Sequence, residues 1–552
     1  MIAACLAVAL AGCGANDTSS QGPGDDTKAQ VKEGGTLHYL STATDMDFEP
    51  ASSQNLGTSG IHLVHRALTG WVTQPQGETK LVPDLATDTG VTHDGGKTWT
   101  YHLQKGLKYS DGSEITAQGV KYGIERSFAP ALQGGLGYHK QLLKGGPDYK
   151  GPYDGKELDS IEVNGKYTIT FHLNKAFGNW PWIVSMPMFA PVPEKADTDP
   201  TVYGRHPVAS GPYKISVFKK GTQVVLTRNK YWKASTDKVR SAGPEKIEYS
   251  LGQNNDTVIQ QLIDDQGDAQ HTVTNASITP AQISRINSDP SVKERVPGSP
   301  SGFLVYLAMN TQRPGLDNVK VRQAIEYAVN KQEIQKLAGG EEYGGKIAST
   351  LMTPGIPGFT KYNLYDGGAT GDIAKAKSLM HDSGEKNLSL SMVYSSDDPG
   401  AEKQAESVKQ ALGKIGISVE LQPMDANSYT ALVTGDKGDY DLTISGWLPD
   451  FPSGMGNIQP LFASSEIGGG GYNLSRYSNP KVDAAITKAA AESDLDKAGK
   501  TWSAIDKQIM ADAPVVPLLY QGMHTICGSK VKNCYLAPYP PFLNILDVGV
   551  SD

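Results

Sequence analysis

The sequence of 552 residues has no excess of basic residues and no apolar segment long enough to cross a bilayer, and each feature excludes a class of protein. Lys and Arg number 51 against 59 Asp and Glu, which gives a formal net charge of -8. This balance excludes the basic face by which proteins bind nucleic acid, and it excludes a polybasic membrane surface. The apolar segment at residues 2–11 is too short to span a membrane, because a helix needs about 20 apolar residues to cross a bilayer.

Residues 2–11 resemble the apolar region of a secretory signal, although no Lys or Arg precedes them. They lead into LAGC at residues 10–13, which resembles a bacterial lipobox, a motif whose cysteine is lipidated and becomes the new N-terminus. We expect residues 1–13 to be a signal peptide with a longer basic leader upstream, and Cys13 to carry the lipid. The alternative is a chance cysteine in an ordinary signal peptide. The polar composition of residues 14–34 predicts a flexible tether that holds an extracytoplasmic domain at the cell membrane.

Two further cysteines, Cys527 and Cys534, lie close together near the end of the sequence. In an oxidising compartment we expect them to form a disulfide with each other, and the alternative is a pair of reduced thiols. No cluster of His and Cys at metal-ligand spacing surrounds them, so a metal site is not expected there.

The length of the chain predicts two or more domains, because one hydrophobic core rarely serves more than about 250–300 residues. The first half is sheet-rich, with a hairpin whose strands at 161–163 and 167–173 flank Asn164-Gly165. In the second half we expect a helix at 317–337 that Asp317 caps. Strands are predicted at 388–393, 417–421 and 440–444, and further helices at 372–384, 401–412, 482–491 and 498–510. Strand, helix and strand with short links form a βαβ unit, which predicts a parallel sheet.

The sequence lacks the catalytic motifs of common enzymes, including His-Glu-x-x-His and Gly-x-Ser-x-Gly. Residues 340–346 match most of a P-loop, but Ile347 stands where Ser or Thr would bind magnesium, so we expect a plain loop. His62 and His65 are spaced like two metal ligands on a helix, but no third ligand is identifiable. We therefore expect no enzymatic activity, no cofactor and no metal.

Four groups of short motifs follow one another from about residue 35 to the end of the chain. They are GPY at 211–213 with VVLTRNKYW at 224–232, LAMN at 307–310 with Asp317 and VRQAI at 321–325, YDL at 440–442 with GWLPD at 446–450, and YNL at 472–474 with Tyr477, NP at 479–480 and VD at 482–483. Together, and in this order, they resemble the family-5 extracellular solute-binding proteins, the peptide- and nickel-binding branch of bacterial ABC importers.

The resemblance implies a bilobal α/β fold of the large, class II periplasmic-binding-protein type. Such a fold has an extra sheet-rich subdomain in lobe one and a hinge of two strands. We expect lobe one at 35–300 with the subdomain inserted at about 71–205, lobe two at 301–520, and a return to lobe one at 521–552.

The same resemblance implies a ligand site around residues 446–450. In oligopeptide-binding relatives, the Asp that follows Gly-Trp by a short step holds the α-ammonium of the peptide, and Asp450 stands at that place. A carboxylate in a closed, water-poor cleft binds an ammonium through a charge-assisted hydrogen bond. Trp447 would offer a flat apolar wall, and Leu448 would offer backbone groups to the first peptide bond of the ligand. An ordinary turn Asp after Pro449, and a core position for Trp447, are the alternatives.

The expected function is that of an extracytoplasmic lipoprotein that captures a small peptide between two lobes and delivers it to ABC permease subunits in the membrane. We expect a monomer that closes by a hinge, since a ligand that contacts both lobes stabilises the closed form. Alternatives are a binding protein for a nickel chelate, an opine or an oligosaccharide, a peptide-sensing receptor without transport, and a secreted hydrolase.

Overall fold

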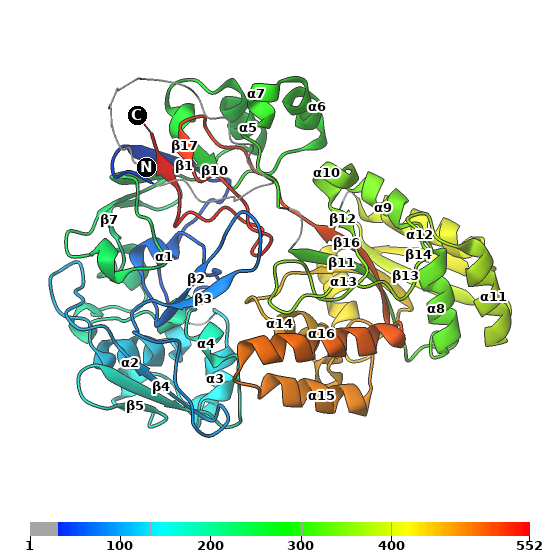
Figure 1. Ribbon diagram of the computed structural model, residues 1–552, viewed down its shortest axis with the longest axis horizontal. Coiled ribbons are helices and arrows are strands. Elements are labelled where there is room, and N and C mark those ends of the chain that lie inside the picture. The colour runs from blue at the N-terminus through cyan, green and yellow to red at the C-terminus, as the bar shows by residue number, and fades with distance from the viewer. Residues whose placement is uncertain (1–30, 133, 300–301, 399, 552) are drawn as a thin grey trace, which may run out of the picture.

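The computed structural model describes residues 31–132, 134–299, 302–398 and 400–551. It has two lobes, each built around one larger β-sheet (Figure 1). We call the part with the five-stranded sheet lobe one and the part with the six-stranded sheet lobe two. The predicted bilobal α/β architecture is confirmed.

The sheet of lobe one has the strand order β10-β1-β9-β8-β7. Its strands are β1 (Thr36–Leu40), β7 (Tyr213–Lys219), β8 (Gln223–Arg228), β9 (Lys246–Ser250) and β10 (Thr272–Thr274). Strand β1 runs parallel to both β9 and β10, so the carboxyl ends of these three strands lie at the same edge of the sheet. Side chains of β9 alternate between the two faces of the sheet, which places Ile247 and Tyr249 in the core, as expected of a half-buried strand.

A smaller sheet, with the order β4-β6-β5, belongs to the lower part of lobe one in Figure 1. Its strands are β4 (Thr98–His102), β5 (Ile161–Val163) and β6 (Thr168–His172). The antiparallel pairing of β5 with β6 confirms the predicted hairpin. Gly165 in its turn has a φ of 72°, a conformation that L side chains rarely adopt and that glycine permits. Helices α2 (Ala117–Arg126), α3 (Tyr138–Leu142) and α4 (Trp180–Ile183) accompany this sheet.

The sheet of lobe two has the order β12-β16-β11-β15-β13-β14. Its strands are β11 (Phe303–Met309), β12 (Lys346–Ile347), β13 (Ser389–Ser395), β14 (Ser418–Met424), β15 (Leu442–Trp447) and β16 (Val515–Gln521). Strands β13 and β14 pair in parallel, and α12 (Ala401–Gly413) connects them in sequence. This arrangement confirms the predicted βαβ unit. Further helices are α11 (Ile373–Ser383), α14 (Gly454–Phe462), α15 (Pro480–Ala490) and α16 (Leu495–Ala511).

The helix predicted at 317–337 is wrong, because the chain forms two helices there. Helix α8 (Val319–Ala328) is capped by Asn318 rather than by Asp317, and α9 (Lys331–Leu337) begins after a second cap. The Asn330 side chain accepts a hydrogen bond from the backbone N–H of Glu333, while Val329 is extended. An Asn that bonds to the backbone in this way favours a new helix start over continuation.

The plain loop predicted at 340–346 is also wrong. A short helix, α10 (Gly340–Gly344), follows α9, and Lys346 begins strand β12. Gly339 and Gly340 have positive φ angles of 111° and 79°, so the two glycines turn the chain between the helices.

The hinge region joins the two lobes at the neighbouring strands β11 and β16. These strands pair antiparallel, from Phe303 opposite Gln521 to Ala308 opposite Val515. Figure 1 shows the chain running between the lobes beside these strands. The lobe boundaries at 300/301 and 520/521 stay predictions.

The largest apolar core contains residues of both lobes, including Trp71 and Trp180 of lobe one and Met455 and Trp502 of lobe two. Figure 1 shows α3 and α4 of lobe one beside α14 and α16 of lobe two. Two smaller apolar cores pack against the larger sheets, one against the five-stranded sheet of lobe one and one against the six-stranded sheet of lobe two. The described lobes are therefore in apolar contact on the side of the molecule opposite α5–α7 (Asn255–Asp264, Pro280–Ser288 and Pro290–Lys293).

Candidate functional site

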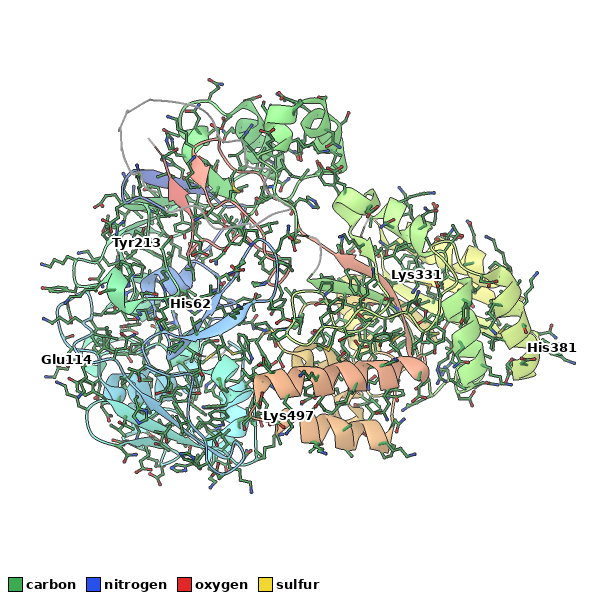
Figure 2. The ribbon with its side chains drawn as sticks, viewed as in Figure 1. His62, Glu114, Tyr213, Lys331, His381 and Lys497 are labelled. Carbon is green, nitrogen blue, oxygen red and sulfur yellow. A yellow bond between two sulfur atoms is a disulfide. The ribbon has the colours of Figure 1, made fainter. Side chains whose placement is uncertain are left out.

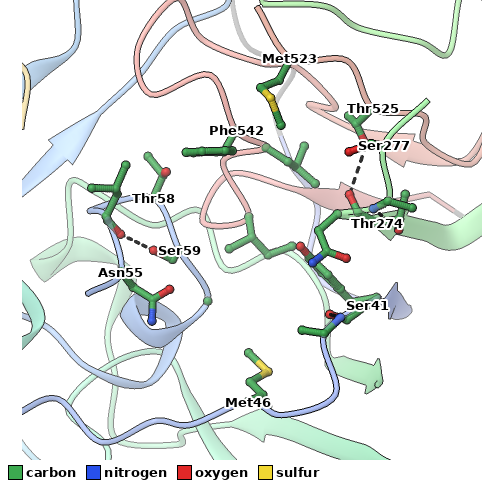
Figure 3. A pocket seen from close by; sticks show the side chains of 18 of the residues that line it. Ser41, Met46, Asn55, Thr58, Ser59, Thr274, Ser277, Met523, Thr525 and Phe542 are labelled. Carbon is green, nitrogen blue, oxygen red and sulfur yellow. Dashed lines mark hydrogen bonds between the residues drawn. The ribbon is translucent and has the colours of Figure 1, made fainter. Parts of the chain in front are cut away.

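A cavity of about 550 Å³ lies at the carboxyl ends of β1 and β10 in lobe one (Figure 3). Ligands of open α/β sheets bind beyond the carboxyl ends of parallel strands, and this cavity occupies that place. Its lining is formed by Tyr39, Ser41, Ala43, Asp45, Met46, Gln54, Asn55, Leu56, Thr58, Ser59, Gly60, Tyr249, Thr274, Asn275, Ala276, Ser277, Met523, His524, Thr525, Leu536, Pro541, Phe542, Leu543 and Ile545.

The wall of the cavity combines two tyrosines with many small neutral polar side chains. The rings of Tyr39 and Tyr249 pack with centroids 4.9 Å apart. The Tyr249 hydroxyl is buried and has no hydrogen-bond partner among the described residues. Burial raises its pKa well above the usual value, so this phenol stays neutral. A buried hydroxyl without a partner is unfavourable.

The hinge forms one margin of the cavity. Met523, His524 and Thr525 follow directly after β16, and the Thr525 hydroxyl donates to the carbonyl of Thr274 at 3.1 Å. The ring of His524 packs against Tyr343 of α10, with centroids 4.7 Å apart. Since α10 belongs to lobe two, this margin of the cavity faces the second lobe.

Asp450 follows β15 of lobe two and lies half-buried at the contact with lobe one. The hydroxyl of Tyr138, at the start of α3 in lobe one, donates to Asp450 Oδ2 at 2.6 Å. The ring of Tyr138 also meets Phe451 edge-on, with centroids 5.6 Å apart. Burial raises the pKa of Asp450, and the hydrogen bond from Tyr138 lowers it in part. In the described part of the chain, no basic side chain pairs with Asp450.

Trp447 and Leu448 precede Asp450 and are both half-buried against the large core. The indole Nε1 of Trp447 donates to the carbonyl of Gly456 at 2.7 Å, which fixes the ring. The ring centroid of Tyr472 lies 5.1 Å away, and Tyr472 is 48% exposed. Trp447 is therefore neither a fully enclosed core residue nor a free surface residue, and its role in ligand contact stays a prediction.

The segment 536–543 links the cavity to Asp450. Leu536 and Phe542 line the cavity, and Tyr539 between them is fully buried. The Tyr539 hydroxyl donates to the carbonyl of Pro449, the residue before Asp450. One short segment of lobe one thus contacts the cavity with its ends and the Asp450 loop with its centre.

A second contact between the lobes lies beside α15. The backbone N–H of Gly178 donates to the carbonyl of Ala490 at 2.7 Å. A Cβ atom on Gly178 would collide with the carbonyl oxygen of Glu492, so only glycine permits this approach. The side-chain amide of Asn179 lies 3.3 Å from the sulfur of Met455 in α14.

Cys527 and Cys534 have adjacent sulfur atoms and Cα atoms 6.4 Å apart, a separation that a disulfide spans. Cys527 is buried in the core of lobe one. Cys13 lies outside the described residues, and its lipidation stays a prediction. Among the described residues, none of the helices combines the length and the apolar composition that a bilayer crossing requires.

His62 and His65 are buried inside lobe one, where Figure 2 labels His62. Burial lowers the pKa of His62 to about 3 and that of His65 to about 4, so both rings are neutral at neutral pH. His65 Nε2 lies 3.0 Å from the carbonyl of Phe48. The described part of the chain holds no cluster of three or more His, Cys, Asp or Glu side chains arranged to bind a metal ion.

The cavity residues were missed by the sequence reasoning. A usable signal was present, because Ser41 and Asn275 each follow directly after a short strand, where sheet ligands bind. Recognising it requires knowing that β1 and β10 are parallel neighbours, although more than 200 residues separate them. Local patterns do not carry that information.

The sequence profile of the bacterial extracellular solute-binding proteins, family 5 (middle region), matches residues 80–469, which is more than half of the chain. The chain belongs to this family. The resemblance predicted from the four motif groups is therefore confirmed.

Curated relatives of this family 5 protein are similar over most of their length. The glutathione-binding protein GsiB of Pectobacterium atrosepticum is 27% identical over 471 residues, covering 84% of each chain. The probable D,D-dipeptide-binding periplasmic protein DdpA of Escherichia coli K12 is 26% identical over 475 residues, also covering 84% of each chain.

Solved structures share the fold. The clavulanic acid biosynthesis oligopeptide binding protein 2 superposes with a TM-score of 0.85 at 29% identity, covering 95% of this chain and 97% of the other. The murein tripeptide binding protein MppA in its unliganded open form has a TM-score of 0.78 at 18% identity, covering 95% and 99%, which shows the fold alone.

Proposed function

We propose that this family 5 protein captures a small amine-bearing solute, a peptide in the first instance, between its lobes and delivers it to ABC permease subunits. The single observation that carries the proposal is Asp450, an acidic side chain at the contact between the lobes that has no basic partner among the described residues. The names of its relatives, which bind glutathione, dipeptides or oligopeptides, support a peptide.

The environment of Asp450 favours a cation. Burying a carboxylate without a counter-charge is unfavourable, and the raised pKa of Asp450 expresses that penalty. The α-ammonium of a peptide would remove it through a charge-assisted hydrogen bond, which is stronger than one between neutral groups. Oδ2 accepts from Tyr138, and the ammonium would bind on the side of Oδ1.

Closure follows from the position of Asp450 and Tyr138 on different lobes. Their hydrogen bond exists only when the lobes are close together. A ligand that is held by Asp450 of lobe two and fills the cavity of lobe one binds the closed form better than the open form. This difference in affinity is what shifts the equilibrium toward closure.

A double-mutant cycle tests the ammonium anchor. Asp450→Ala should weaken binding of a native peptide by about 3–5 kcal/mol, because it leaves the buried ammonium unpaired. That loss corresponds to roughly two to four decades in affinity. Asp450→Asn should behave nearly alike, since the amide keeps the shape and loses the charge. The measurement is calorimetry with a peptide recovered from the purified protein.

The same peptide with an acetylated N-terminus serves as the other arm of the cycle. It should bind poorly to the unmodified protein, and neither substitution should weaken it much further. If acetylation and substitution act additively instead, Asp450 does not hold the amine and the proposal fails.

Membrane attachment belongs to the proposed function. The mature protein should begin at Cys13 carrying a diacylglyceryl group, as the lipobox at residues 10–13 indicates. The intact mass of protein extracted from the membrane fraction measures this directly. A retained leader or an unmodified Cys13 would contradict it.

A further inference from the structure

The side chain of Tyr539 is a fixed part of lobe one that reaches a loop of lobe two. The residue is fully buried. Its ring packs beside Trp71 of β2 (Thr69–Val72), with centroids 6.1 Å apart. Its backbone carbonyl accepts a hydrogen bond from the hydroxyl of Thr79, the residue before β3 (Lys80–Pro83). Because lobe one holds both the ring and the backbone, it also sets where the phenol hydroxyl lies.

The hydroxyl of Tyr539 bonds to lobe two at the residue before Asp450. It donates to the carbonyl of Pro449, a buried residue in the loop between β15 and α14. A buried carbonyl without a hydrogen-bond partner costs free energy, so this bond favours the observed position of the loop. Since the acceptor belongs to the backbone, the bond restrains where the Cα atom of Asp450 lies rather than how its carboxylate is turned.

Two tyrosines of lobe one therefore restrain Asp450 at different points. The hydroxyl of Tyr138 donates to Asp450 Oδ2 at 2.6 Å, which orients the carboxylate, and Tyr539 holds the backbone one residue earlier. Burial, and then the nearby charge of Asp450, raises the pKa of both phenols, so both stay neutral donors. The two restraints leave Oδ1, which neither tyrosine bonds, for a ligand.

We infer that Tyr539 is a positioning residue for the amine site, which raises the affinity for an ammonium by holding the backbone of the Asp450 loop against lobe one. This inference rests on the proposed function, in which Asp450 binds the amine. A charge-assisted hydrogen bond requires its two heavy atoms about 2.7–2.9 Å apart, so a small displacement of the loop weakens it. A loop that is already in the binding geometry also loses less conformational freedom when the amine arrives.

Tyr539→Phe separates the hydrogen bond from the packing, because it keeps the ring beside Trp71 and removes only the donor. The probe is the peptide that co-purifies with the unmodified protein, resynthesised with a free N-terminus, and calorimetry measures its affinity. Tyr539→Phe should weaken binding about tenfold. In the Asp450→Asn background, where no charge is left to position, the same substitution should weaken binding by less than about twofold.

A role of Tyr539 in lobe closure alone gives a different result and would overturn the inference. Loss of a contact between the lobes weakens every closed complex, so Tyr539→Phe would then cost about tenfold in both backgrounds. An unchanged affinity of Tyr539→Phe would overturn it as well. The proposed function fails separately, if Asp450→Asn by itself leaves the affinity unchanged or if no peptide co-purifies, and the inference then fails with it.

Tyr213→Phe is the matched control for the loss of a buried phenol. Tyr213 is fully buried in the core of lobe one, and its hydroxyl donates to the carbonyl of Pro244 at 2.6 Å. Both variants should lower the melting temperature, but Tyr213→Phe should keep the affinity, and an equal loss of affinity in both would overturn the inference.

A second variant serves if Tyr539→Phe does not fold. Thr79→Val removes the hydrogen bond that holds the Tyr539 backbone. In the same cycle it should weaken binding about threefold where Asp450 is present and leave the Asp450→Asn background unchanged. An equal loss in the two backgrounds would overturn the inference.

Discussion

Among single residues, Asp450, the proposed ammonium anchor, has a raised pKa, so we expect ligand affinity to depend on pH. A bound ammonium stabilises the ionised carboxylate, so protonation of Asp450 in the free protein competes with the ligand. Affinity should be constant above the raised pKa and should fall by up to about tenfold per pH unit below it. Calorimetry of a native peptide across the acidic range measures this slope.

Asp450→Asn is the control for the pH effect, because its amide does not titrate. The variant should bind weakly with little change across the same range. If the unmodified protein and the variant show the same slope, another group is responsible and the predicted role of Asp450 in the pH response is wrong.

The sequence singles out Asp450 because a local motif, GWLPD at 446–450, carries it, and its role as ligand anchor stays a prediction. It could not identify Tyr138 as the contact of Asp450, because the two residues come from different lobes and lie 312 positions apart. Tyr249 was missed for a similar reason: it lines the cavity only because β9 and β1 lie side by side. Local motifs thus pointed to single residues but not to their partners from distant segments.

At the scale of elements, Asp506 of α16 holds the loop at residues 350–352 in lobe two. It accepts hydrogen bonds from the backbone N–H groups of Leu351 and Met352 and from the hydroxyl of Tyr362, the last at 2.6 Å. Burial nevertheless raises its pKa from 3.8 to about 6. The folded protein therefore binds this proton more tightly than the unfolded chain does.

The consequence is a pH-dependent contribution to stability. The protonated form of Asp506 stabilises the fold below about pH 4, and this contribution is lost as the pH rises through about 6. Chemical denaturation should show the free energy of unfolding of the unmodified protein falling relative to Asp506→Asn by about 3 kcal/mol between pH 4 and 7. A difference that does not vary with pH would contradict the prediction.

A disulfide between Cys527 and Cys534, which their geometry allows, is predicted to stabilise the returning C-terminal segment. A disulfide that closes so short a loop should contribute roughly 2–3 kcal/mol on the chain-entropy model. Replacing both cysteines by alanine should lower the melting temperature, and a reductant should have the same effect on the unmodified protein alone. Two thiols that can be alkylated in the folded, exported protein would disprove the pairing.

Helices were predicted well where the period of the apolar residues and the capping residues indicated the same boundaries. Helix α11 begins after Asp372 and ends before Gly384, as its capping residues indicated. The interruption between α8 and α9 was missed because Val329 and Asn330 do not break an apolar period. The break combines the local Asn330 cap with contacts outside the helix, including the bond from the Gln332 N–H to the carbonyl of Ala369. Such tertiary contacts override local propensity.

In the molecule as a whole, Gly178 approaches the end of α15 closely, and we expect this contact to limit how the lobes meet. Gly178→Ala should push the lobes apart, because its Cβ would collide with the carbonyl oxygen of Glu492. The radius of gyration from solution scattering should increase, and ligand affinity should fall. Gly413→Ala is the matched control, since a Cβ there meets nothing within 4 Å. If both variants scatter alike, this contact does not set the lobe arrangement.

The return of the C-terminal segment to lobe one has a consequence for biosynthesis. The core of lobe one contains Ile545, Leu546 and Val548 beside Leu37 and Ile247, and β18 (Gly549–Val550) pairs with β17 (Val531–Lys532). Lobe one thus emerges first from the ribosome but cannot complete its core until residue 550 has been translated. The six-stranded sheet, whose strands all lie between residues 303 and 521, has every partner available earlier. The six-stranded sheet of lobe two can therefore be completed before the core of lobe one, which requires the last residues of the chain.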